Sequence, residues 1–192
     1  MIPALLEQII GPPVVTPLAP DWEAVAAQYG LVFPADYRAL TERYSALDIC
    51  QYFSVYHPTS RSGNLFSVLE AQIQAVKVYL QRTQTFAGGW DPKNATVIPS
   101  GEEVEVDYDF FPEPGGLLPW GVGENGAKCL WLTHEHPEKW TVVIGDDYFG
   151  WWHYKGSMTS FLVDVISQRI VCPVIDDTFP EDWLDEVTYQ NP

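Results

Sequence analysis

Four short segments between residues 117 and 154 constrain the fold more than any other part of the chain. Each is rich in aromatic and β-branched residues, and turns containing Gly or Asp separate one from the next, as between consecutive antiparallel strands. The predicted strands are residues 117–121, 127–133, 140–145 and 149–154. Together they form a meander, in which each strand pairs with the one before it.

Two helical patterns precede the meander. Asp21 is a suitable N-cap, and Gly30 a suitable closing residue, for a helix over residues 21–29. Pro34 has the backbone angle that suits a first helical position, so a second helix should begin there. Its buried stripe is predicted to consist of Tyr37, Leu40 and Tyr44.

A strand and a long helix are predicted between these helices and the meander. Residues 47–57 are rich in aromatic and branched side chains and stop at Pro58, as one strand would. Residues 65–83 carry the longest apolar stripe at helical spacing in the chain. Gly88 and Gly89 are predicted to end that helix.

A last helix and an acidic tail follow the meander. Ser157 is predicted to be the N-cap of the helix. The tail after Pro173 should lie over the surface. Helices first, a meander later and a closing helix do not fit the alternating order of a doubly wound fold. We therefore predict one α+β domain over residues 1–192, with a core at about 21–170 and a tail at 173–192. Its sheet should be mostly antiparallel, with the helices packed on one face.

The charge balance separates the possible classes of partner. The chain has 26 acidic and 10 basic residues, a net charge of −16. Affinity for nucleic acids and for anionic membranes comes from clustered Lys and Arg, so neither is an expected partner. Such a field favours solubility and fast, salt-sensitive association with a basic protein. Because 46% of the residues are hydrophobic and 14% aromatic, the chain should fold by itself despite its charge.

Cysteine usage and hydropathy predict a cytoplasmic protein. No apolar run reaches the length of about 18 residues that a membrane span requires. Glu7 and Gln8 interrupt the N-terminal apolar segment before it could serve as a signal peptide. Cys50, Cys129 and Cys172 are far apart, odd in number and flanked by apolar residues, as is typical of buried thiols in a reducing compartment. We expect neither a disulfide framework nor a cysteine-based zinc site.

Several short strings occur in a characteristic order along the chain. They are Phe33-Pro34-Ala35-Asp36-Tyr37, Tyr56-His57-Pro58, Leu118-Pro119-Trp120-Gly121, Trp131, Ser157-Met158 and Phe161-Leu162. With these strings, the segment from Asp21 to about Ile170 resembles the SUKH superfamily, best known as bacterial immunity proteins and also represented by fungal cell-wall regulators. The chain departs from the family at Tyr44-Ser45-Ala46-Leu47, where a Tyr-Gly-x-Gly-like turn is usual.

The resemblance implies a fold and a role. The role is that of a cytoplasmic protein that binds a cognate toxin, often a nuclease, and blocks it in the producing cell or its siblings. The matched residues are fold determinants and do not identify a contact surface. The same fold also allows a second hypothesis, a regulatory scaffold that binds several partners without any toxin. Under both hypotheses the protein is not an enzyme and needs no cofactor.

Two acidic stretches are candidates for the contact surface. Six acids and no Lys or Arg lie between Glu102 and Glu113, and six more acids lie in the tail. Alternation on the strand-like segment 104–108 would place a line of like charges on one face, which Lys and Arg of a partner would neutralise. A solvated surface is the alternative interpretation. Bound calcium is a third, although the tail lacks the spacing of a calcium loop.

The hairpin over residues 146–152 completes the predicted surface. Trp151 and Trp152 must face opposite sides if they lie in a strand, so one of them is predicted to be exposed as an interface anchor. The predicted partner-binding residues are Glu102, Glu103, Glu105, Asp107, Asp109, Asp146, Asp147, Trp151 and Trp152.

Histidines offer the one enzymatic alternative, a metal-dependent hydrolase. His134 and His136 stand at i and i+2 and could ligate a metal together with the acids of the following hairpin. Pro137 follows them directly, however, and a polar loop between two strands explains the pattern better. Motifs for a nucleophile elbow, a phosphate loop or a dinucleotide site are absent from the sequence. We therefore predict no metal and no catalytic residue, and we expect His57 and His153 to be hydrogen-bonded structural side chains.

Overall fold

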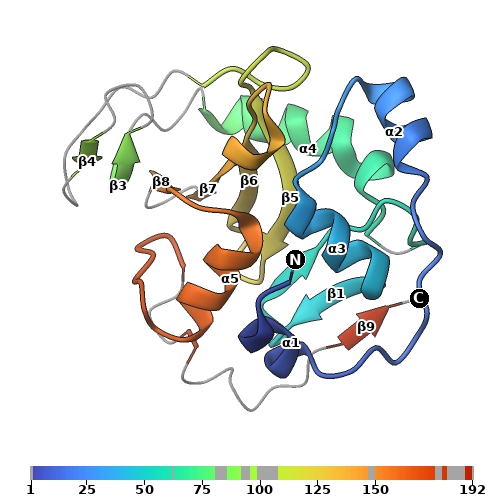
Figure 1. The fold of residues 1–192 in the computed structure, drawn as a ribbon. Helices are drawn as coiled ribbons and strands as arrows, with labels where there is room; N and C mark the ends of the chain where they lie inside the picture. Colours follow the sequence, from blue (N-terminus) through green and yellow to red (C-terminus); the bar gives the residue numbers. More distant parts are fainter. Residues whose placement is uncertain are drawn as a thin grey trace.

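One sheet runs through the described part of this computed structural model, which comprises residues 2–61, 63–80, 86–91, 96–98, 108–146, 150–175, 179–180 and 189–191. Its strands are β1 (Ala46–Ile49), β2 (Phe53–Val55), β3 (Phe86–Asp91), β4 (Thr96–Ile98), β5 (Leu117–Gly123), β6 (Lys128–Leu132), β7 (Thr141–Asp146), β8 (Gly150–Tyr154) and β9 (Tyr189–Asn191). Their order across the sheet is β4-β3-β8-β7-β6-β5-β2-β1-β9 (Figure 1). Neighbouring strands are antiparallel, except that β3 and β8 are parallel.

The predicted meander is confirmed. Strands β5 to β8 pair in sequence order, with Trp131 of β6 opposite Leu118 of β5 and Val142 of β7. The meander meets β2 at Gly121, which lies opposite Val55. A Cβ atom on Gly121 would come within 2.5 Å of the Ser54 carbonyl oxygen, so the close approach of β2 and β5 requires a glycine here.

The predicted single strand over residues 47–57 is wrong, because this segment is a β-hairpin. Strands β1 and β2 pair antiparallel, with Ile49 opposite Phe53. Cys50 and Gln51 between them have φ angles of 53° and 52°. Positive values at both central residues are what a type I′ turn requires, and Asn-Gly is its usual sequence. Cys-Gln carries no such signal, so the pattern alone indicates a continuous strand.

The helices are α1 (Ala4–Ile10), α2 (Trp22–Tyr29), α3 (Ala35–Arg43), α4 (Leu65–Leu80) and α5 (Met158–Ile166). The predicted caps of α2 are confirmed, since Asp21 accepts a hydrogen bond from the Ala24 N–H at 3.0 Å and Gly30 is left-handed. Ser157 caps α5 as predicted. Gly88 and Gly89 do not end α4, however. They lie within β3, where Gly89 pairs with β4 and β8.

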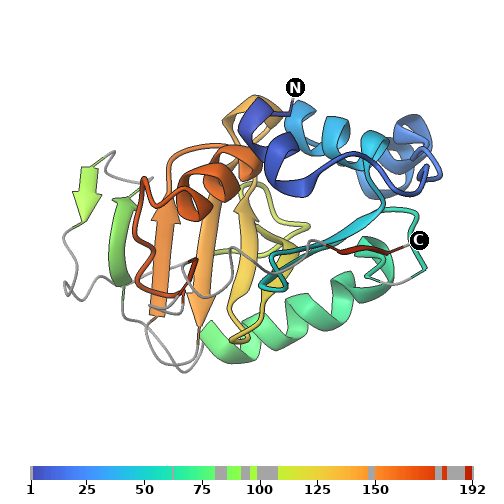
Figure 2. The same cartoon turned by 90° about the horizontal axis from the view of Figure 1, so that it is seen from below.

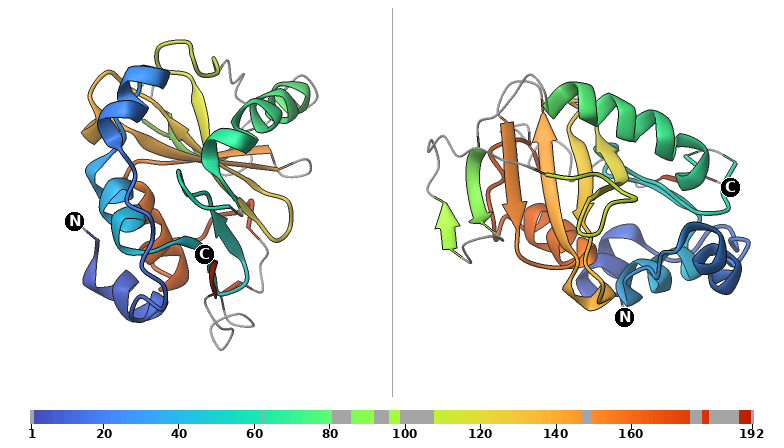
Figure 3. Two further views of the ribbon diagram at one scale, coloured as in Figure 1. Left: turned by 90° about the vertical axis from the view of Figure 1, so that its right-hand side faces the viewer. Right: turned by 90° about the horizontal axis from the view of Figure 1, so that it is seen from above.

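Helices cover both faces of the sheet, not one face as predicted. Figures 2 and 3 show α4 on one face and α5, with α1 and α3, on the other. Strand alternation supplies an apolar layer to each side. Leu130 and Val143 pack with Val76 of α4, whereas the neighbouring Trp131 and Val142 join the larger cluster. Strands buried on both faces have nearly continuous apolar sequences, which is why the polar alternation of a one-sided sheet is missing here.

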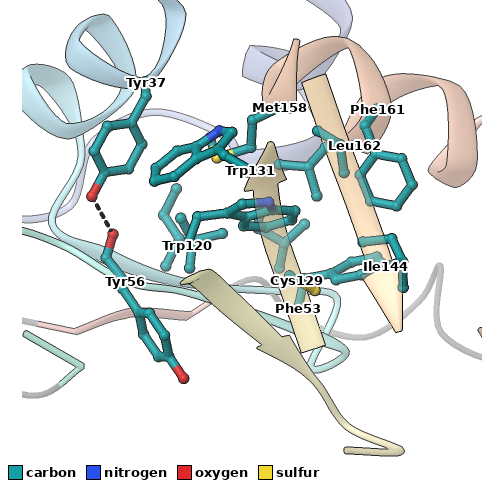
Figure 4. Packing of buried hydrophobic residues seen from close by; sticks show 14 of the residues in the cluster. Tyr37, Phe53, Tyr56, Trp120, Cys129, Trp131, Ile144, Met158, Phe161 and Leu162 are labelled. Atoms are coloured by element: carbon teal, nitrogen blue, oxygen red, sulfur yellow. Dashed lines mark hydrogen bonds between the residues drawn. The ribbon is translucent and has the colours of Figure 1, made fainter. Parts of the chain in front are cut away.

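Aromatic side chains dominate the core beneath α5 (Figure 4). The Trp131 and Tyr37 ring centroids are 4.8 Å apart, and the Tyr37 hydroxyl donates a 2.8 Å hydrogen bond to the Tyr56 carbonyl oxygen. Burial raises the pKa of Tyr37 well above its ordinary value. The strings that carry the SUKH resemblance converge on this core, which contains Phe33, Tyr37, Tyr56, Leu118, Trp120, Trp131, Met158, Phe161 and Leu162.

The tail after Pro173 was predicted to lie over the surface, but its described parts include buried residues. Val174 is buried, and its carbonyl oxygen accepts a hydrogen bond from Asn125 Nδ2 at 3.0 Å. The Phe179 ring packs 4.3 Å from that of Tyr52. Further along, β9 extends the sheet beside β1. Helix α1 also contributes buried side chains, so the hydrophobic core extends beyond the predicted one in both directions.

Candidate partner-binding surface

The predicted contact residues belong to two segments, the stretch that leads to Asp109 and the β7–β8 hairpin. Asp109 is exposed. Asp146 is the last residue of β7 and pairs with Gly150 of β8. Five predicted residues lie outside the described ones, namely Glu102, Glu103, Glu105, Asp107 and Asp147.

Tyr108 brings the two segments into contact. Its ring centroid lies 6.0 Å from that of Trp151, and its hydroxyl lies 3.3 Å from Nδ1 of His153. Both partners belong to β8, the second strand of the hairpin. Tyr108, and with it the neighbouring Asp109, is therefore held against the hairpin, although the two segments are far apart in the sequence.

The backbone at Asp109 is also fixed from the side of β5. The Leu117 N–H donates to the Asp109 carbonyl oxygen at 2.8 Å, and the Phe111 N–H donates to the Leu117 carbonyl oxygen at 3.0 Å. Lys77 Nζ of α4 lies 5.5 Å from the centroid of the Phe110 ring. With its main chain held and its side chain exposed, Asp109 presents a carboxylate to solvent at a defined place.

Neither tryptophan of the hairpin is an exposed anchor, which contradicts the prediction. Trp151 is 0% exposed and Trp152 is 8% exposed. The two do belong to different clusters, because Trp151 packs in the cluster that contains Val76, and Trp152 lies 6.2 Å from the ring of Phe161 in α5. Since helices cover both faces of the sheet, alternation buries both side chains. Trp151 is buried but still supports the surface, because the Tyr108 ring packs against it.

The His134–His136 segment is an exposed loop between β6 and β7, as predicted. The His136 N–H donates to His134 Nδ1 at 3.0 Å, and His136 Nε2 lies 3.6 Å from Glu135. The loop continues into a short 3-10 turn, η1 (Pro137–Lys139). Among the residues described, His, Cys, Asp and Glu form no group of three or more that could hold a metal ion.

The other two histidines are buried and hydrogen-bonded, as predicted. His57 Nε2 lies 2.8 Å from the Thr41 carbonyl oxygen, and Nδ1 accepts a hydrogen bond from the Thr59 N–H at 3.1 Å. These partners fit a neutral imidazole with its proton on Nε2. Burial lowers the pKa of His57, against the opposing effect of its backbone hydrogen bonds. His153 Nε2 lies 2.7 Å from Thr141 Oγ1, so it links β7 to β8.

Asp48 of β1 is an acidic group that the sequence did not single out. Its pKa is raised by burial and then by the charge of Glu124, while a hydrogen bond with Ser54 lowers it. Glu124 follows β5, and its N–H donates to the Tyr52 carbonyl oxygen at 2.8 Å. The two carboxylates come near each other because β2 pairs with both β1 and β5. Sequence spacing gives no sign of this approach, since it depends on the order of strands in the sheet.

The three cysteines are free and buried, as predicted. Burial, with a smaller contribution from Cys172, raises the pKa of the Cys129 thiol far above its ordinary value. A thiol in this state is a poor nucleophile and a poor metal ligand. Cys129 is therefore a packing residue of the sheet.

Comparisons with protein-family models, with curated proteins and with solved structures gave no match. The function must therefore be inferred from the chain's own residues. Over the described ranges, no helix is both long enough and apolar enough to cross a membrane.

Proposed function

We propose that this protein binds a basic protein partner and blocks it. The acidic surface that makes the contact consists of the stretch 102–109 and the β7–β8 hairpin. The observation that carries this proposal is the packing of Tyr108 on Trp151 and His153, because it holds the residue next to Asp109 against a hairpin that is distant in sequence. The net charge of −16 supports a basic partner, since such a field accelerates encounters with positive surfaces.

The nature of the partner follows from the SUKH resemblance. Each string that carries the resemblance contributes at least one side chain to the same core, which supports a common role of these strings in the fold. On this basis the partner is a toxin domain, and a nuclease suits the charge best. A nuclease presents Lys and Arg to the phosphates of its substrate. An acidic protein bound to that surface excludes the substrate, in the cytoplasm and without a cofactor.

Buried groups hold Tyr108 and Asp109 in place. Trp151 supports Tyr108, and the Leu117 N–H fixes the main chain at Asp109. A contact residue whose backbone is already held loses less conformational entropy on binding than a free one. Repulsion among the acids is relieved when cationic side chains of the partner approach. We therefore expect association to be fast at low salt and slower at high salt.

The proposal predicts that a toxin domain is encoded beside this protein's gene, and the test is binding of the neighbouring gene product. The variant Glu105→Lys/Asp107→Lys reverses two charges in the acidic stretch. The matched control Glu135→Lys/Glu138→Lys makes the same change in the loop between β6 and β7. We expect the first variant to bind at least ~10-fold more weakly, mainly through slower association, and the control to change affinity by less than ~3-fold.

Two outcomes would contradict the proposal. Equal weakening by both double variants would show that the overall field matters and that the acidic stretch is not the contact surface. Failure of the wild-type protein to bind the neighbouring gene product, and to rescue cells that express it, would remove the toxin role. Association rates measured by stopped flow at two salt concentrations distinguish long-range electrostatic attraction by the overall charge from direct contact with the acidic stretch.

A further inference from the structure

The turn between β5 and β6 contains Asn125-Gly126, the only Asn-Gly pair in the sequence. Both residues are exposed, and Gly126 has a φ angle of 85°. Asn-Gly is the pair in which an asparagine side chain loses ammonia most readily, because glycine has no Cβ atom to shield its own amide nitrogen. The turn shares no residue with the acidic surface.

The Asn125 side chain fastens a segment that follows α5 to this turn. Its Nδ2 donates to the Val174 carbonyl oxygen at 3.0 Å, and its Oδ1 accepts from the Ala127 N–H at 3.1 Å. We call residues 172–175 the docked segment. Val174 is 0% exposed, so packing as well as the amide holds this segment in place.

Deamidation of an Asn-Gly pair needs only water as a co-reactant. The backbone nitrogen of Gly126 loses its proton and attacks Cγ of Asn125. A new C–N bond forms, the bond from Cγ to Nδ2 breaks, and the proton leaves with the departing ammonia. Water then opens the resulting succinimide ring to aspartate or isoaspartate, depending on which of its two carbonyl carbons is attacked.

The folded turn restrains the attacking and the leaving nitrogen. The Gly126 N–H donates to the Gly123 carbonyl oxygen at 2.9 Å, so the attacking nitrogen is engaged. The leaving nitrogen is bound to the carbonyl of Val174. The Ala127 N–H, in contrast, polarises Oδ1 in the way that a donor stabilises a developing oxyanion. Release of the docked segment therefore frees the leaving group while the side-chain carbonyl stays activated.

We propose that Asn125 is a deamidation site and that docking of residues 172–175 controls its rate. The reaction makes release of the segment permanent. Neither aspartate nor isoaspartate carries a side-chain N–H, so the buried Val174 carbonyl loses this donor. The new carboxylate also lies next to Glu124 in the chain and repels it.

The first experiment follows deamidation of the full-length wild-type protein in a mildly alkaline buffer. Samples are digested in acid, which stops the reaction, and peptide mass spectrometry measures the fraction of Asn125 that has become acidic. The rate in the folded protein should be at least ~10-fold below the rate in urea, because the reaction requires local opening. Asn64 is the internal reference and should react more slowly than Asn125 in urea, since the side chain of Leu65 hinders attack.

The second experiment tests docking with two valine variants. Val174→Ala removes two methyl groups from the docked segment and should speed conversion of Asn125 by ~5-fold or more. Val171→Ala makes the same change where the side chain is 85% exposed, and it should leave the rate within ~2-fold. Equal rates in the two variants, or equal rates in folded and urea-unfolded wild type, overturn the proposal.

The third experiment examines the product and does not depend on the valine variants. Asn125→Asp should speed hydrogen exchange at the Ile175 amide, which donates to the Cys172 carbonyl oxygen within the docked segment, by ~5-fold or more. Gln28→Glu makes the same amide-to-acid change on α2 and should leave that exchange rate within ~2-fold. Unchanged exchange at Ile175 in Asn125→Asp would show that the segment docks without the amide, which overturns permanent release.

Discussion

At the scale of single residues, the fold depends on glycines where a Cβ atom would clash with neighbouring groups, and on a buried histidine that stays neutral. Gly121 lets β2 and β5 approach, and Gly145 lets the Trp151 ring pack against β7, where a Cβ atom would come within 2.6 Å of it. His57 remains neutral among backbone partners. Each position can be tested separately, because the physical cause differs.

Gly121→Ala should lower the free energy of unfolding by about 1–3 kcal/mol, because the added methyl group meets backbone that cannot move aside. The comparison is Gly126→Asn, at a left-handed position with open space around it, which should cost less than about 1 kcal/mol. Urea titrations of both variants provide the measurement. A smaller loss for Gly121→Ala than for Gly126→Asn would show that β2 can shift.

His57 should make the wild-type protein less stable as the pH falls below about 6.5, the ordinary pKa of histidine. In that range the unfolded chain binds a proton that the folded protein, with its lowered His57 pKa, does not. His57→Gln loses buried hydrogen bonds and should be less stable at pH 7.5 by about 1–3 kcal/mol. The difference between wild type and variant should shrink as the pH falls toward 5. If the free energies of unfolding of wild type and His57→Gln changed in parallel with pH, His57 would not take up a proton on unfolding.

At the scale of elements, the local patterns were sufficient for helices α2 to α5 and for the meander, whereas helix α1 was not predicted. The caps Asp21 and Ser157 and the stripe on α4 act within a few residues, so the sequence shows them directly. The hairpin at Cys50 was not predictable, because nothing in its residue types indicates positive φ angles. The pairing of β9 with β1, and the second covered face, depend on contacts between distant segments. The acidic stretch was visible as charge, whereas the contact of Tyr108 with the β7–β8 hairpin was not.

The burial of the α4 face can be tested with two valines on one helix. Val76→Ala removes two methyl groups from a side chain that is 1% exposed and packs with Leu130 and Val143, and it should cost about 2 kcal/mol. Val78→Ala makes the same change where the side chain is 53% exposed. It should be neutral or slightly stabilising, since Ala favours helix. Similar losses in thermal unfolding would mean that α4 does not pack as described.

At the scale of the whole molecule, the net charge of −16 destabilises the folded state, because acidic side chains repel one another when the chain is compact. The free energy of unfolding should therefore rise when salt screens this repulsion. We expect the urea midpoint to increase between about 0.02 and 0.2 M sodium chloride, where the Debye length shortens severalfold. Binding to a basic partner should weaken over the same range. A midpoint that falls with salt would indicate that ion pairs outweigh repulsion.

The pairing of Asp48 with Tyr189 has a consequence for synthesis. Strand β1 leaves the ribosome early and β9 late, with a delay on the order of ten seconds at roughly 5–20 residues per second. Through that interval the outer edge of β1 has no neighbour, and a bare edge of this kind pairs readily with other chains. The nascent chain is therefore more exposed to aggregation than the finished protein, and slower translation would prolong the risk.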